Sequence, residues 1–318
     1  MTSILLTGAS GFIGRQLLPR LIQAFPEATI TAASGHDGAH DLPVGVTGVT
    51  VDLEDKTETR AMVEAATPDL VIHLAARSSV ADSLASPWPV WRGNVLGTMH
   101  LAEAVKAVSP DAALIFASTA EVYGRAFASG EVLTEDAALG PANPYARSKA
   151  ACEYALQDLW GSSGKLVTLR IFNHIGPGQD ERFVASTFAA QIARMEAGLL
   201  PPRMKVGNLG VERDFGDVRD LIDAIMAVTA ALPGLSARST FNVCSGRPRP
   251  VQALLDGLIA LSTLTPEVEV DPERVRPGEL QRVAASNAAI HAATGWTPKR
   301  DLSETLAILL NDWRARVV

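Results

Sequence analysis

A short apolar run that leads directly into three spaced glycines constrains this chain more than any other feature. Residues 4–6 read Ile-Leu-Leu, and Gly8, Gly11 and Gly14 follow before a helical pattern begins. Glycines at this spacing permit a tight turn, close approach of the backbone to a pyrophosphate, and close packing of the next helix on the sheet. Glycine spacing alone is a weak signal in a chain with 25 glycines, but the strand–turn–helix context favours a dinucleotide site over a plain turn.

Short apolar runs alternate with longer segments that carry apolar residues at helical spacing. The predicted strands are residues 4–6, 29–33, 49–51, 70–74, 112–117, 166–171 and 241–244, and the predicted helices are residues 12–25, 57–66, 90–108, 145–160 and 302–313. Unbroken apolar strands are typical of a sheet that is buried on both faces. The alternation therefore predicts an α/β fold with a Rossmann-type, doubly wound parallel sheet.

Glycine and proline divide the second half of the chain into shorter pieces. We expect residues 1–172 to form the dinucleotide-binding Rossmann domain and residues 173–318 to form a smaller, mixed C-terminal lobe that binds substrate. The late strand at 241–244 indicates that the segment around 214–245 returns to the first domain.

Composition excludes several classes of partner. The formal net charge is −7 and no basic block is present, so we expect neither nucleic acid nor an anionic membrane as a partner. We expect a small-molecule substrate instead. Cys152 and Cys244 are far apart and lack metal-ligand spacing, so no disulfide framework and no metal site is predicted. The first apolar run is too short for a signal peptide or a membrane span, and we expect a cytoplasmic location.

The end of the second predicted strand indicates which dinucleotide is held. An acid at this point accepts hydrogen bonds from the ribose 2′-hydroxyl of NAD and repels the 2′-phosphate of NADP. Because the strand ends without an acid, we favour NADP(H), with Ser34 and His36 as phosphate contacts; Asp37, one step later, keeps NAD(H) as an alternative. Asp52 and Leu53 follow the third strand, where they are expected to cover the adenine or to cap a helix.

Tyr145 and Lys149 form the candidate catalytic pair. They lie four residues apart in a predicted helix, which places them on one face. A lysine ammonium beside a phenol is expected to lower its pKa from about 10 toward neutrality, so that the pair relays a proton beside a hydride transfer. Thr119 closes the fifth strand and is expected to orient the substrate oxygen. Asn94 is interpreted either as part of a proton relay or as an ordinary hydrogen-bonded polar residue.

Together these residues resemble the extended short-chain dehydrogenase/reductase family, in its nucleotide-sugar-modifying branch. The resemblance covers essentially the whole chain and rests on motifs at residues 7–14, 73–76, 94, 118–119 and 145–149. It implies that the cofactor is bound by Gly8, Ser10, Gly11, Phe12, Ile13, Gly14, Ser34, His36, Asp52, Leu53, Leu74, Ala75, Ala76, Tyr145 and Lys149. It also implies a homodimer formed through a four-helix contact.

The second half of the chain looks most like the reductases that convert GDP-4-keto-6-deoxy-D-mannose into GDP-D-rhamnose. The matching segments are residues 170–179, 205–209, 213–220 and 276–279. The resemblance implies that residues 173–318 bind a nucleotide sugar through Asn173, Lys205, Val206, Asn208, Arg213, Arg276 and Glu279. In it, Arg213 and Arg276 grip the diphosphate, which suits the bidentate pairing of guanidinium with phosphate oxygens; surface ion pairs are the alternative role.

Glu121 points to a rival activity. Residues 119–123 resemble the Thr-x-Glu-x-Tyr segment of nucleotide-sugar 4,6-dehydratases, in which the acid serves as a base. Ala120 stands where glucose-type dehydratases carry an aspartate, so a mannose-type dehydratase is the closer rival, and an epimerase also stays open. Glu121 is otherwise a solvated loop residue. A non-catalytic, dinucleotide-sensing protein is a remote alternative, because both Tyr145 and Lys149 are present.

Overall fold

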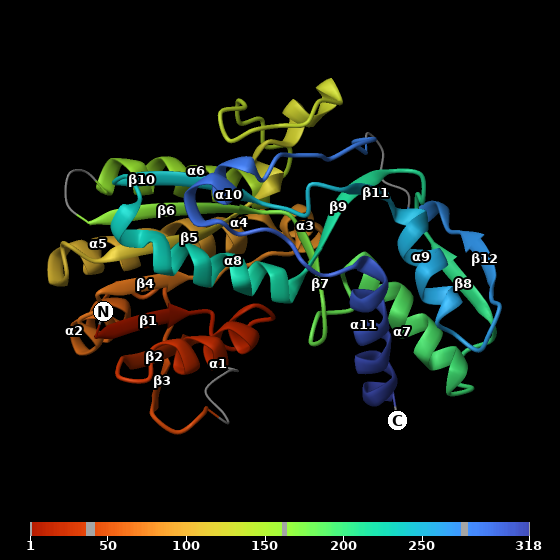
Figure 1. Cartoon of the computed structure of the whole chain (residues 1–318), viewed down its shortest axis with the longest axis horizontal. Coiled ribbons are helices and arrows are strands. Elements are labelled where there is room, and N and C mark those ends of the chain that lie inside the picture. Colours follow the sequence, from red (N-terminus) through yellow and green to blue (C-terminus); the bar gives the residue numbers. More distant parts are fainter. Residues whose placement is uncertain (1, 36–41, 161–163, 275–278, 318) are drawn as a thin grey trace.

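A seven-stranded parallel sheet forms the centre of the larger of two lobes (Figure 1). The computed structural model describes residues 2–35, 42–160, 164–274 and 279–317. The strand order is β10-β6-β5-β4-β1-β2-β3, and every neighbouring pair runs parallel. The strands are β1 (Ser3–Thr7), β2 (Thr29–Ser34), β3 (Val46–Thr50), β4 (Leu70–His73), β5 (Ala113–Thr119), β6 (Lys165–Ile171) and β10 (Arg238–Val243). The predicted doubly wound fold class is confirmed.

Helices cover both faces of this sheet, which explains why its central strands are buried. All residues of β1, β4 and β5 are buried. One face packs against α1 (Gly14–Ala24), α8 (Val218–Ala231) and α10 (Ala288–Thr294), and the other packs against α2 (Lys56–Ala66), α5 (Gly97–Val108) and α6 (Pro144–Leu159). Strand β10 and helix α8 thus come from the second half of the chain and join the sheet of the first half.

The predicted helix over residues 90–108 is present but is not α-helical throughout. It consists of α4 (Pro87–Trp91), a π-helical turn η1 (Arg92–Leu96) and α5, and a short helix α3 (Val80–Ala85) precedes it. Pro87 starts α4 at a position where a proline needs no amide hydrogen. The π turn widens the helix around Asn94, whose side chain bonds to backbone from another segment. The spacing of apolar residues does not reveal the π turn, because it carries no information on the contact between Asn94 and the distant backbone of Arg77.

The smaller lobe has its own apolar core. Its elements are β7 (Asn173–Ile175), α7 (Val184–Glu196), β8 (Arg203–Val206), β9 (Glu212–Asp217), β11 (Pro248–Pro250), α9 (Val251–Ala260), β12 (Glu267–Val270) and α11 (Leu302–Val317). The strands form two small sheets, β11-β9-β7 and β12-β8. Short helical turns occur at η2 (Ala120–Val122), η3 (Gly124–Ser129), η4 (Leu232–Gly234) and η5 (Pro272–Arg274).

Within the described ranges, no helix is both long and apolar enough to cross a bilayer.

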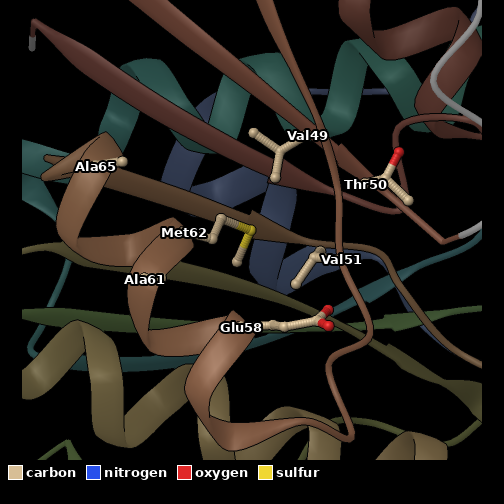
Figure 2. A pocket seen from close by; sticks show the side chains of 7 residues that line it. All are labelled: Val49, Thr50, Val51, Glu58, Ala61, Met62 and Ala65. Carbon is tan, nitrogen blue, oxygen red and sulfur yellow. The ribbon is translucent and has the colours of Figure 1, made fainter.

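A hollow of about 500 Å³ opens between edge strand β3 and α2, where Met62 and Val51 form part of an apolar floor and Glu58 supplies a charged side chain (Figure 2). It contains none of the predicted catalytic residues, so the candidate site lies elsewhere.

Candidate active site

The glycine turn between β1 and α1 has no room for a side chain at Gly8 or at Gly14. Gly8 has a φ of +74°, and a Cβ added there would lie 2.7 Å from the amide nitrogen of Ala75. A Cβ on Gly14 would lie 2.2 Å from the carbonyl oxygen of Gly8, which also accepts a hydrogen bond from the amide of Gly11 at 3.0 Å. The turn therefore folds back on itself at the start of α1, where free backbone amides suit a pyrophosphate.

A hollow of about 230 Å³ lies beside this turn, at the carboxyl ends of the parallel strands. Its lining includes six predicted cofactor residues, namely Gly8, Ser34, Asp52, Leu53, Ala75 and Ala76. Ligands of doubly wound sheets bind at this edge. Leu74 follows directly after β4, and its amide donates to the carbonyl of Thr7 at 3.1 Å. The predicted contact His36 lies outside the described residues.

Asp52 does not cap the helix that follows it, so that alternative is wrong. Asp55 is the N-cap of α2, and its carboxylate accepts from the amides of Thr57 and Glu58 at 2.7 and 3.0 Å. Asp52 instead accepts from the amide of Glu54 at 2.9 Å and remains on the lining of the cofactor hollow.

The remaining turn residues pack around the start of α1. The carbonyl of Ser10 accepts from Arg15, Ile13 contacts the core under α1, and the ring of Phe12 lies near Gly176 of the second half. In addition, the side-chain amide of Gln16 donates to the carbonyl of Pro177 at 3.1 Å. The glycine turn thus also contacts the segment that leads into the smaller lobe.

Thr119, Glu121 and Tyr145 meet at the end of β5. Pro144 begins α6, and Asn143 caps it by accepting from the amide of Ala146 at 2.8 Å. This places the Tyr145 phenol near Thr119, whose side chain opposes the rise in the phenol pKa that burial causes. The side-chain amide of Asn143 also donates to Glu121 at 3.0 Å. Sequence reasoning missed Asn143, although an asparagine immediately before Pro144 is a recognisable helix-start signal.

Burial shifts the pKa values of the catalytic pair in opposite directions. Burial raises the pKa of Tyr145 to about 12, the Thr119 hydrogen bond opposes this, and the charge of Glu121 adds to it. Burial lowers the pKa of Lys149 to about 8, because the ammonium is the charged form of that group. The expectation that Lys149 draws the phenol toward neutrality is wrong in this structure. The ammonium lies over the Phe116 ring, 4.1 Å from its centroid.

Asn94 is buried with its side chain fully engaged. Its oxygen accepts from the amide of Arg77 at 2.8 Å, and its nitrogen donates to the Arg77 carbonyl at 3.2 Å and to Ser148 Oγ at 2.9 Å. These bonds join the segment after β4 to the catalytic helix. This arrangement agrees with the interpretation of Asn94 as a hydrogen-bonded polar residue and gives it a structural link to α6.

His73 is a second buried polar link that sequence reasoning did not use. Its ring nitrogens contact Thr7 Oγ1 at 2.6 Å and Thr98 Oγ1 at 2.9 Å. Burial, with the nearby charge of Lys149, lowers its pKa to about 3, so the ring is neutral. The motif at residues 73–76 includes this histidine, so the sequence did contain a signal that could have identified it.

The predicted substrate residues lie in both small sheets. Asn173 is exposed at the start of β7, which pairs with the strand that carries Arg213. Arg213 donates to the Leu280 carbonyl at 2.9 Å and pairs with Glu279 at 3.4 Å. The predicted partner Arg276 lies outside the described residues.

The segment that carries Lys205, Val206 and Asn208 is held by its backbone. The amide of Lys205 donates to Gln191 at 3.0 Å, and its carbonyl accepts from Arg274 at 3.1 Å. Val206 is fully buried in the core of the smaller lobe, so a ligand can meet only its backbone. Lys205 is exposed, and Asn208 Oδ1 accepts from the amide of Gly210 at 3.1 Å.

The fold and the site define a class of enzyme. A doubly wound sheet, a glycine turn at its carboxyl edge and a helix that carries the half-buried Tyr145 and the buried Lys149 together define an extended short-chain dehydrogenase/reductase. In the part of the chain that the structure describes, no group of three or more histidine, cysteine, aspartate or glutamate side chains is placed to hold a metal ion.

The chain belongs to the GDP-mannose 4,6 dehydratase family, whose sequence model matches residues 5–309. It is 34% identical to a GDP-6-deoxy-D-mannose reductase of Pseudomonas aeruginosa over 99% of this chain and 98% of that protein. The structure of RMD from Pseudomonas aeruginosa complexed with NADPH is similar, with a TM-score of 0.83, 34% identity, and coverage of 99% of this chain and 100% of that one. A Thermus thermophilus UDP-glucose 4-epimerase complex with NAD has a TM-score of 0.85 and 30% identity, with 98% of each chain covered.

We predict that Gly14→Ala weakens dinucleotide binding by roughly tenfold or more, a loss of about 1.4 kcal/mol or more. The added methyl group meets the Gly8 carbonyl at 2.2 Å, so the turn must move and its amides are displaced. Titration with NADPH, followed by nucleotide fluorescence, measures the change.

Gly234→Ala is the matched control, because a Cβ at Gly234 meets no atom within 4 Å. Its affinity should equal that of the wild type. Wild-type affinity in Gly14→Ala would show that the turn does not hold the dinucleotide.

Proposed function

We propose that this protein uses a nicotinamide dinucleotide to reduce the C4 ketone of a GDP-4-keto-6-deoxy-hexose, giving GDP-D-rhamnose. The observation that carries the proposal is the neutral Tyr145 phenol beside Thr119, at the sheet edge that also carries the glycine turn. The full-length similarity to a GDP-6-deoxy-D-mannose reductase supports the choice of substrate.

The chain's own residues supply the proton and hold the oxygen. A nicotinamide dinucleotide held by the glycine turn would supply the hydride for C4, and one proton would complete the addition across the C=O bond. Tyr145 donates that proton to the developing alkoxide, and Thr119 supplies a second hydroxyl to the same oxygen. Lys149 lies one turn further along the same helix, and in this proposal its ammonium offsets the negative charge that forms on Tyr145 only once the proton has left, whereas burial sets the pKa of the resting phenol.

The binding residues follow from the same proposal. The cofactor is held by the glycine turn and by the hollow lined by Ser34 and Asp52. NADP(H) is favoured because β2 ends at Ser34 without an acid, and similar proteins are complexed with NADPH and with NAD, so NAD(H) is the alternative. The predicted division into residues 1–172 and 173–318, with 214–245 returning, is supported by β10 in the central sheet.

The GDP moiety is assigned to the smaller lobe. Asn173 and Arg213 lie on paired strands, and Glu279 holds Arg213. The two cysteines are buried as free thiols, which supports the proposed cytoplasmic location.

A GDP-mannose-type 4,6-dehydratase is the second candidate, and Glu121 favours it. Asn143 holds the Glu121 carboxylate beside Tyr145, where a base can remove a proton next to a transient ketone. Ala120, however, places no acid group at the position of the usual proton donor. The reductase is therefore preferred.

The proposed reaction consumes one reduced nicotinamide for each keto group. We expect the purified protein, mixed with GDP-4-keto-6-deoxy-D-mannose and NADPH, to lose nicotinamide absorbance in equal amount to the GDP-D-rhamnose formed. GDP-mannose alone, as the control, should remain unchanged. Conversion of GDP-mannose without net NADPH oxidation would instead establish the dehydratase.

Tyr145→Phe should lower turnover about 100-fold or more while leaving NADPH affinity nearly unchanged. The variant keeps the ring but removes the hydroxyl that hydrogen-bonds Thr119 and donates the proton. Steady-state assays together with NADPH titration separate the two effects. Tyr154→Phe is the control, because it also removes one hydroxyl from the same helix but keeps the ring and lies outside the active site. Equal turnover in Tyr145→Phe and wild type would remove Tyr145 from the mechanism.

We also propose a homodimer formed by the helices next to the active site. Large apolar side chains are exposed on α4, η1 and α6, namely Trp88 (67%), Leu96 (43%) and Tyr154 (58%). Both α4 and α5 pack against α6, so these side chains lie on adjacent helices. A second copy related by a two-fold axis would bury them in a four-helix contact.

Leu96→Arg should convert the dimer into a monomer, because two buried guanidinium groups would face each other across the two-fold axis. Light scattering after size exclusion measures the mass. Leu199→Arg changes a more exposed leucine (63%), which lies in the smaller lobe, and should stay dimeric. A monomeric wild type at micromolar concentration would refute this dimer.

A further inference from the structure

A buried ion pair between Glu153 and Arg170 begins one helical turn after Lys149. Glu153 is one helical turn after Lys149 in α6, and its side chain is 1% exposed. It pairs with Arg170 of β6 at 2.8 Å, and the Arg170 side chain is 7% exposed. Glu153 also accepts a hydrogen bond from Ser118, the neighbour of Thr119. One carboxylate therefore joins the helix of Tyr145 to the strand end that carries Thr119.

The arginine of this pair is itself surrounded by polar partners. Arg170 donates to the Tyr123 hydroxyl at 2.9 Å and to the Glu135 carbonyl at 2.8 Å, and it stacks on the Tyr123 ring. The Tyr123 hydroxyl donates in turn to Asn242 of β10 at 2.7 Å. The described polar groups of the pair thus find partners inside the protein, which is the condition under which two buried charges are tolerated.

Stability alone does not account for this pair. Well-packed apolar residues often replace a buried ion pair without loss of stability, so its presence calls for another role. Tyr145, Lys149 and Glu153 follow one another at four-residue spacing and lie on one helix face. A carboxylate at that position favours the charged form of the lysine, which burial disfavours.

The other groups around Lys149 do not replace this carboxylate. On the same helix, Cys152 is a buried thiol whose pKa burial raises, so it stays neutral. His73 of β4 is also neutral. The neighbouring turn and α5 present Asn94 and Thr98, which carry no charge. Arg170 is paired with Glu153, and the charge of Glu121, in η2, raises the pKa of Tyr145.

We propose that Glu153, held by Arg170 and Ser118, is a positioning residue that keeps Lys149 cationic beside Tyr145 and ties the helix to the strand of Thr119. The inference rests on the proposed function, in which the cationic lysine supports proton donation by Tyr145. It links Asn242 of β10, through Tyr123 and Arg170, to Glu153, which lies one helical turn from Lys149.

The test compares Glu153→Gln with Glu153→Asp. The glutamine keeps the shape and a hydrogen-bond acceptor but removes the charge, so the pKa of Lys149 should fall. The high-pH limb of kcat/KM for GDP-4-keto-6-deoxy-D-mannose reduction should then move to lower pH by about 1 unit. The aspartate keeps the charge and should restore the wild-type limb. An unchanged limb in Glu153→Gln overturns the proposal.

Lysine titration gives a readout that needs no turnover. In protein labelled with ¹³Cε-lysine, the Lys149 signal is assigned by its loss in Lys149→Arg, and its midpoint should fall by about 1 pH unit in Glu153→Gln. This separates the two proposals. A wild type that binds NADPH but reduces no 4-keto sugar refutes the proposed function, whereas an unchanged lysine midpoint refutes the role of Glu153.

Two further variants guard against loss of folding. Glu153→Leu combined with Arg170→Met removes both charges, so no charge is left buried alone, and it should still lower the lysine midpoint. Glu196→Gln breaks a similar partly buried pair with Arg314 in the smaller lobe and should leave the midpoint and the pH profile as in the wild type. A wild-type midpoint in the double variant would show that the pair is only structural.

Discussion

Burial of one face of α6 against β5 is the constraint on which the active site depends. The same desolvation raises the pKa of Tyr145 and lowers that of Lys149, because it disfavours a phenolate and an ammonium alike. Burial therefore favours the neutral form of both side chains. A reduction needs a phenol that keeps its proton until an alkoxide forms, and this arrangement provides it. Thr119 then brings a second hydroxyl to the same place without any charge.

The order of the chain serves this constraint. After β6 the chain leaves the central sheet, builds half of the elements of the smaller lobe and then returns as β10. The return places Asn242 against Tyr123, and Tyr123 against Arg170. The excursion is therefore structurally coupled to the helix that carries the chemistry, although its own residues lie far from that helix in sequence.

Local features of this protein could be predicted from its sequence, whereas long-range pairings could not. The glycine turn and the Tyr145–Lys149 spacing depend on residues within one turn or one helix, and the apolar strands reflect burial on both faces. The π turn at Asn94 depends on a bond to Arg77, 17 residues away. The link between Glu153 and Arg170 likewise has no local signal. The direction of the Tyr145 pKa shift was predicted wrongly, because spacing shows that a lysine is near but does not show how deeply both groups are buried.

The same geometry explains why reduction and dehydration are close neighbours in this fold. Both need a hydroxyl donor at the substrate oxygen, and in the proposed mechanism Thr119 and Tyr145 provide it. They differ in whether the site can also move a proton at a carbon atom. Asn143 holds Glu121 near the phenol, yet Ala120 is buried and offers no acid to a leaving hydroxyl. Elimination needs both groups, whereas hydride addition needs neither. A site with only one of them is therefore better suited to reduction, and its carboxylate mainly keeps Tyr145 protonated by adding negative charge beside the phenol.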